Sequence, residues 1–133
     1  MKRLLNRILD RRKILDTNII LRYLLNDDAS LSDKARQIIS TENCIAYLEV
    51  ISEVVFVLQS PRCYGIPRCD IAEQLRLLSD EILIDKWDVL DCALNAYVEK
   101  PKLDFVDCLL YGYSQNGYSV ETFDKRLSRK LPN

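Results

Sequence analysis

Short apolar segments alternate with longer segments of helical periodicity along the chain, and this alternation constrains the fold most. Parallel strands need such long crossover connections, whereas antiparallel strands can be joined by tight turns. We therefore expect an α/β layer sandwich with a short, mainly parallel central sheet. Strands are expected at 13–15, 43–46, 81–84 and 118–122, and helices at 18–25, 30–40, 47–59, 67–78, 87–99 and 104–115.

The length of the chain fits one domain. At 133 residues it can bury about two-thirds of the surface that it exposes when unfolded, so no disulfide or metal is needed merely to fold it. We expect a single domain over residues 1–133, in which residues 1–12 are a basic N-terminal extension. These residues do not form a signal peptide, and no segment has the roughly 20 apolar residues of a membrane span. A cytoplasmic protein without membrane contact is expected.

Charge and composition exclude several functional classes. Lys and Arg number 19 and Asp and Glu number 20, so only local patches or metal ions would bind a polyanion. The five cysteines form no C-x-x-C pair and there is no histidine, which argues against a zinc site and for reduced, mostly buried thiols. The missing histidine also excludes Ser-His-Asp, Cys-His and histidine-based ribonuclease chemistry. The working groups of an enzyme would be carboxylates, lysines or tyrosines.

Several carboxylates stand where a parallel sheet would bring functional groups. Asp16 directly follows the first predicted strand, and Asp124 follows the fourth after a two-residue step. Ligands of open parallel sheets bind outside the carboxyl ends of the strands, so both side chains are expected at one rim. Asp104 and Asp107 lie at the start of a helix, where the macrodipole favours negative charge. Glu53 lies in a helix that reads as apolar almost all round, where a buried carboxylate needs a cation as its partner.

Each acid also has a purely structural interpretation. Asp16 and Asp104 can cap helices, Asp107 can be a first-turn acid, Asp124 can be a turn residue, and Glu53 can pair with an arginine. Yet three or four carboxylates at one rim would repel each other strongly unless a divalent cation lay between them. Hard oxygen ligands without histidine or thiolate suit Mg²⁺ or Mn²⁺, and such a site suits the hydrolysis of phosphodiester bonds.

Three segments carry a resemblance to a known family: LDTNIILRYLL, SEVVFVL and LDFVDCLLYGYSQNGYSVETFDKRL. In this order and spacing they resemble the motifs of PIN-domain ribonucleases, most closely the VapC-like toxins of bacterial and archaeal toxin–antitoxin pairs, over roughly residues 13 to 127. The resemblance implies a PIN-like three-layer α/β/α sandwich and a Mg²⁺- or Mn²⁺-dependent endoribonuclease. The family's catalytic, metal-binding acids fall on Asp16, Glu53, Asp107 and Asp124, with Asp104 as a secondary ligand.

The resemblance also implies supporting residues and partners. Asn18 is the polar companion of Asp16, and Thr122 supports the last acid from the Thr-Phe-Asp segment. RNA is the expected substrate, and its phosphates would bind basic side chains near the acids. The candidates are Arg22, Lys125, Arg126, Arg129 and Lys130, although a solvated basic tail explains the last four equally well. A small antitoxin protein and a homodimer are the implied partners. Tyr111-Gly112-Tyr113 departs from the family's preference for small residues after the third acid.

Three classes of function remain open. The favoured one is the metal-dependent ribonuclease toxin. The second is a PIN-type RNA-processing nuclease without an antitoxin, and the third is a catalytically inactive module that binds RNA or protein. A hydrolase that forms an aspartyl-phosphate on Asp16 is a weaker alternative, because such an enzyme would want a second aspartate where Asn18 stands.

Overall fold

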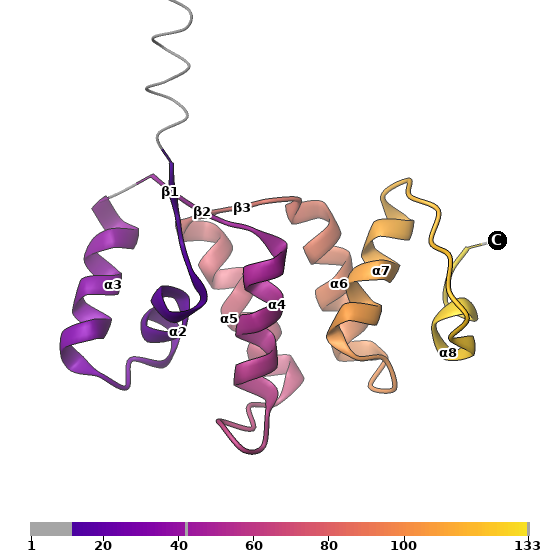
Figure 1. Cartoon of the computed structure of the whole chain (residues 1–133), viewed down its shortest axis with the longest axis horizontal. Helices are drawn as coiled ribbons and strands as arrows, with labels where there is room; N and C mark the ends of the chain where they lie inside the picture. The colour runs from indigo at the N-terminus through magenta and orange to yellow at the C-terminus, as the bar shows by residue number, and fades with distance from the viewer. Residues whose placement is uncertain (1–11, 42, 133) are drawn as a thin grey trace, which may run out of the picture. The chain divides into compact units, whose positions relative to one another are not determined.

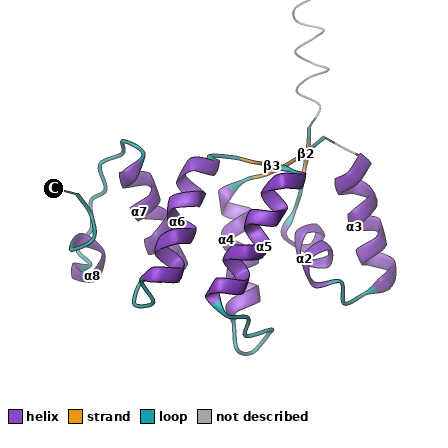
Figure 2. Ribbon diagram, turned by 180° about the vertical axis from the view of Figure 1, so that it is seen from behind, coloured by secondary structure: helices purple, strands orange, loops and turns teal. Residues whose placement is uncertain are grey.

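Three short strands form a parallel sheet in the computed structural model, which describes residues 12–41 and 43–132. Strand β1 (Lys13–Ile14) pairs with β2 (Cys44–Ala46), and β2 pairs with β3 (Leu83–Ile84), both in parallel. Figure 2 shows these strands joined by helices and loops. The predicted α/β class with a short parallel sheet is therefore confirmed. Residues 1–11 of the predicted extension lie outside the described part of the chain.

The helices agree closely with the sequence periodicity (Figure 1). Within the described residues they are α2 (Thr17–Leu25), α3 (Ala29–Thr41), α4 (Leu48–Gln59), α5 (Arg68–Glu81), α6 (Trp87–Glu99), α7 (Phe105–Gln115) and α8 (Lys125–Ser128). Helix α5 extends past the predicted end at residue 78, and α8 was not predicted as a helix. None of the described helices has both the length and the apolar character that a membrane crossing requires.

The chain forms two compact units. Unit 1 consists of Met1–Val54 and Leu77–Asp85, and therefore holds the sheet, α2 and α3. Unit 2 consists of Val55–Arg76 and Lys86–Asn133, and holds α6, α7 and α8. Helices α4 and α5 cross the boundary between the two units.

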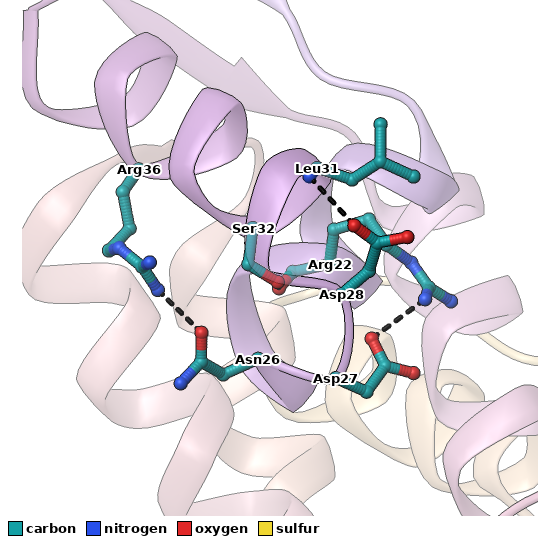
Figure 3. Close-up of polar contacts among 7 residues, drawn as sticks. All are labelled: Arg22, Asn26, Asp27, Asp28, Leu31, Ser32 and Arg36. Carbon is teal, nitrogen blue, oxygen red and sulfur yellow. Dashed lines mark hydrogen bonds and ion pairs between the residues drawn. The ribbon is translucent and has the colours of Figure 1, made fainter.

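Polar contacts fix the turn between α2 and α3 in unit 1 (Figure 3). The backbone N–H of Leu31 donates to Asp28 Oδ1 at 3.0 Å, so Asp28 caps α3. Helix α3 therefore begins at Ala29, one residue before its predicted start at 30. The buried Ser32 hydroxyl donates to the Arg22 carbonyl at 2.8 Å and joins the two helices.

In unit 2, contacts of the half-buried Arg68 join α5 to the end of α6 and to the loop between α6 and α7. The Arg68 guanidinium lies 4.3 Å from the centre of the Tyr97 ring and donates to the carbonyl oxygens of Tyr97 and Leu103, at 3.0 and 2.7 Å. Tyr97 is fully buried, and its ring packs edge-on against Phe105. These contacts fix the loop that follows α6.

Two predictions of secondary structure and burial were wrong. Residues 118–122 form no strand, because the Tyr118 N–H bonds to the Tyr113 carbonyl and the two rings pack edge to face, which continues the turn after α7. Helix α4 is also not buried all round. Its apolar side chains at 51, 54, 55 and 58 take one face, and Glu53 and Phe56 are exposed on another.

The cysteines divide by exposure, so the prediction of mostly buried thiols is only partly correct. None of the five, all of which lie in the described residues, forms a disulfide; Cys44 and Cys108 are buried, whereas Cys63 and Cys69 are exposed. Burial raises the pKa of the Cys108 thiol to about 11, which disfavours its reactive thiolate.

In the folded protein we expect iodoacetamide at mildly alkaline pH to label Cys63 and Cys69 first. Peptide mass spectrometry after a short reaction measures this, and equal labelling of Cys108 would contradict it.

Candidate metal centre

Asp16 lies at the junction of the sheet with α2 in unit 1. Strand β1 ends at Ile14, Leu15 is buried, and Asp16 is the exposed N-cap of the helix. Its Oδ1 accepts from the Ile19 N–H at 3.0 Å, as a capping aspartate does. The other oxygen, Oδ2, has no hydrogen-bond partner among the described residues. Capping therefore occupies one oxygen and leaves the second for another ligand. Asn18 is exposed in the first turn.

Glu53 is linked to the same helix start by Thr17. The Thr17 hydroxyl donates to Glu53 Oε2 at 2.7 Å, which joins the first residue of α2 to α4. Glu53 is exposed, so the prediction of a buried carboxylate was wrong. Sequence reasoning also missed Thr17, although its position between Asp16 and Asn18 is a signal that could have found it. Within unit 1, Glu53 is thus in contact with the residue that follows Asp16.

Asp104 and Asp107 form a capping box at the start of α7 in unit 2. The Asp107 N–H donates to Asp104 Oδ1 at 2.8 Å, and the Asp104 N–H donates to Asp107 Oδ2 at 3.4 Å. The structural interpretation of both acids is therefore correct as far as the backbone is concerned. The box also fixes the two carboxylates close together.

Asp124 is the N-cap of α8 in unit 2. Its Oδ1 accepts from the N–H groups of Arg126 and Leu127, at 2.8 and 3.4 Å. The Thr122 hydroxyl oxygen in turn accepts from the Asp124 N–H at 3.0 Å. Asp124 follows a loop rather than the predicted strand, so a sheet edge does not position it. The capping hydrogen bonds fix the Asp124 carboxylate, and Thr122 fixes the Asp124 backbone, in place of a strand.

The three acids of unit 2 share one electrostatic environment. Partial burial is the largest cause that raises the pKa of Asp107, and the charges of Asp104 and Asp124 raise it further, against the opposing effect of the Asp104 N–H. No lysine or arginine forms an ion pair with any of the candidate acids in residues 12–41 and 43–132. The three acids of unit 2 therefore raise one another's cost of ionisation without an ion pair in the described residues to offset it, and a bound cation would relieve this repulsion.

The donor chemistry fits a hard cation, although the conformation is not that of a closed site. Within the described residues, no three acidic or cysteine side chains meet closely enough to hold a metal. Mg²⁺ usually keeps several waters and takes only one or two carboxylates directly, so a loose set of acids is compatible with such an ion. Within unit 1 the hydrogen bond to Asp16 leaves one carboxylate oxygen for such a cation. Within unit 2 the hydrogen bonds to Asp107 and Asp124 likewise leave carboxylate oxygens.

The predicted phosphate-binding residues differ in their surroundings. The Arg22 guanidinium binds Asp27 at 2.7 Å, and only 20% of its side chain is exposed (Figure 3). Its role in RNA binding stays a prediction, which this ion pair does not favour. Lys125 and Arg126 are exposed on α8, and no ion pair engages either of them within the part of the chain that the structure describes.

A comparison with protein families identifies the class of the chain. The family model of the PIN domain matches residues 13–130, which include all the candidate acids. The chain belongs to the PIN-domain family. No curated protein and no solved structure matches the sequence significantly. PIN domains are generally nucleases that act on RNA, and they generally use divalent metal ions.

The raised pKa of Asp107 predicts how the stability of this PIN domain depends on pH. The folded state binds the proton more tightly than the unfolded state, so the contribution of Asp107 to stability falls as the pH rises from its ordinary pKa of 3.8 through the folded value. Asp107→Asn keeps an acceptor for the Asp104 N–H and removes the charge. Urea unfolding should show the variant gaining on the wild type between pH 4 and neutral pH. A constant difference would contradict this.

Proposed function

We propose that this PIN-domain protein is a Mg²⁺- or Mn²⁺-dependent endoribonuclease and the toxin of a toxin–antitoxin pair. The observation that carries the nuclease proposal is the family match over residues 13–130. The exposed acids without basic partners within the described residues support it, because a hydrolase of this kind needs carboxylates that a cation and a substrate can reach.

The resemblance assigns the cation ligands to Asp16, Glu53, Asp107 and Asp124, with Asp104 as a secondary ligand, and we propose these roles. A bound divalent cation would lower the pKa of a water molecule and neutralise charge on the phosphate. The chain itself supplies orientation. Backbone N–H groups fix one oxygen of each capping aspartate, and the Thr17 hydroxyl holds one oxygen of Glu53.

Asn18 and Thr122 are proposed as supporting residues. The Thr122 hydroxyl accepts from the Asp124 backbone, so it restrains the residue that carries the acid rather than the carboxylate itself. Asn18 is exposed one residue beyond Thr17, where its amide can contact the substrate. Lys125 and Arg126 are proposed to bind RNA phosphates, since both are exposed beside Asp124.

The toxin role, a small antitoxin partner, a homodimer and a cytoplasmic location rest on the resemblance to VapC-like toxins. The alternatives are a PIN-type RNA-processing nuclease without an antitoxin, and an inactive PIN module that binds RNA or protein. A small DNA-binding protein encoded beside this chain, and relief of growth arrest when the two are expressed together, would distinguish the toxin from an RNA-processing nuclease.

Cleavage of a labelled single-stranded RNA by the purified chain, with Mg²⁺, Mn²⁺ or EDTA, tests the proposal. We expect internal cleavage with either metal and none with EDTA. Glu53→Gln should reduce cleavage by roughly a hundredfold or more, because it removes a cation ligand. It should leave the melting temperature unchanged or raise it, because the amide oxygen can still accept from Thr17 and one charge is removed. Metal-independent cleavage, or equal cleavage by the variant, would refute the proposal.

A further inference from the structure

A basic cavity in unit 2 is lined by several cations, of which the proposed function uses only Arg126. It has a volume of about 480 Å³, within the range of pockets that bind small molecules. Its charged lining residues are Lys100, Lys102, Arg126, Arg129, Lys130 and one acid, Glu99. Arg126, Arg129 and Lys130 were predicted from the sequence to bind phosphate, and the structure adds the two lysines of the loop between α6 and α7.

The positive charge around this cavity is not neutralised within the described residues. None of its five cations forms an ion pair in residues 12–41 and 43–132, although the net charge of the whole chain is only −1. Lys100 is half-buried, with its ammonium 4.6 Å from the centre of the Tyr111 ring. Gathering cations around a concavity costs electrostatic energy that a bound anion would recover.

Backbone hydrogen bonds preorganise both walls of the cavity. On one wall, the Lys100 N–H donates to Ala96 and the Leu103 N–H donates to the Lys100 carbonyl, at 2.7 and 3.0 Å. On the other, the buried Leu127 anchors α8, and the Lys130 N–H donates to its carbonyl at 2.9 Å. The backbone that carries the cations is therefore already ordered, and binding an anion would order only their side chains.

We propose that this cavity binds the phosphate backbone of the RNA strand beyond the point of cleavage. The inference rests on the proposed nuclease function, because Asp124 and Arg126 lie at the start of the same short helix. A strand held at Asp124 need extend only along α8, about 6 Å of helix, to reach Arg129 and Lys130. Arginine guanidinium groups also suit bidentate binding of phosphate.

The test measures RNA binding without cleavage. A fluorescent single-stranded 2′-O-methyl RNA is titrated with the full chain in EDTA, at several salt concentrations. The test variant is Arg129→Gln/Lys130→Gln, in which both side chains are exposed and the long stems are retained. The matched control is Lys34→Gln/Arg62→Gln, which removes the same charge from exposed positions that do not line the cavity. Thermal melts establish that both variants fold.

We expect the test variant to bind RNA roughly tenfold more weakly and to lower the salt dependence of log K by about 1.4, the value for two phosphate contacts with a single strand. The control should bind as the wild type does. If both variants bind RNA equally weakly, the loss of affinity comes from the change in net charge and the inference is overturned. Unchanged binding by the test variant would also overturn it. Displacement of RNA from the wild type by a polyglutamate peptide as readily as by unlabelled RNA would also overturn it, in favour of an acidic protein segment.

The binding result is separable from the proposed activity. If the wild type does not cleave RNA with Mg²⁺ or Mn²⁺ but the test variant alone loses affinity, the RNA site stands and the nuclease proposal falls. If cleavage occurs and the test variant binds like the control, the nuclease proposal stands and this inference falls.

Discussion

Asp16→Asn should reduce metal-dependent RNA cleavage by about a thousandfold while the protein remains as stable as the wild type. An asparagine caps a helix as well as an aspartate does, so its oxygen can still accept from the Ile19 N–H. What it lacks is the negative charge that a hard cation needs, a loss worth several kcal/mol in a reaction assisted by such an ion. Single-turnover cleavage rates and thermal melts of the two proteins measure the two effects.

Asp16→Ala is the control that separates capping from charge. It removes both functions, so it should lose cleavage to the same extent and also lose about 1 kcal/mol of stability, or roughly 4 °C in melting temperature. If Asp16→Asn cleaves RNA like the wild type while Asp16→Ala is merely less stable, Asp16 is only a helix cap. The metal site would then have to be assigned without Asp16.

Gly112→Ala should destabilise the protein by about 2 kcal/mol, although alanine is the better helix former. Gly112 is buried in α7, where an added Cβ would lie 2.4 Å from the Val89 carbonyl oxygen and 3.3 Å from the Ala93 nitrogen of α6. Figures 1 and 2 show these two helices side by side. Because the close atoms belong to the backbone, no side-chain rotation relieves the contact. Urea unfolding monitored by circular dichroism gives the change in the free energy of unfolding.

Gln115→Ala is the matched control for this prediction. Gln115 is exposed in the same helix, so alanine there should leave stability unchanged or raise it slightly. Equal stability of Gly112→Ala and the wild type would mean that α6 and α7 can move apart without cost. Gly112 lies between Tyr111 and Tyr113 and is the residue of α7 that meets the backbone of α6. A loss of stability in Gly112→Ala would show that only this position must be small, which explains why the two tyrosines are tolerated.

Regular elements were predictable where their apolar periodicity was long. Helix α6 has the predicted bounds, and its buried residues recur at helical spacing from Val89 to Tyr97. The segment 118–122 has strand-like residues but no such context. Its first residue is held by a local contact with Tyr113. This contact between residues five apart decided the conformation of the segment, and strand propensity alone could not reveal it.

The candidate acids were predictable as positions, but not in their environments. Capping was foreseen for Asp16 and Asp104 because both precede helices. The exposure of Glu53 was not foreseen. Apolar residues occur on every face of α4 in the sequence, so the sequence alone does not show which face is buried. The loop lysines at 100 and 102 were missed for a different reason. They lie more than twenty residues from α8 in sequence, and only the folded unit 2 places them around the same cavity.

The Arg68 contact has a consequence for substrate binding at the basic cavity. Its guanidinium binds the Leu103 carbonyl, so a side chain from α5 pins the end of the short loop that carries Lys100 and Lys102. A substitution such as Arg68→Lys would release that carbonyl without touching a single charge at the cavity. If the cavity binds RNA, its affinity would then depend on how rigidly Arg68 holds this loop. Weakening the Arg68 hydrogen bond would raise the rate at which RNA dissociates.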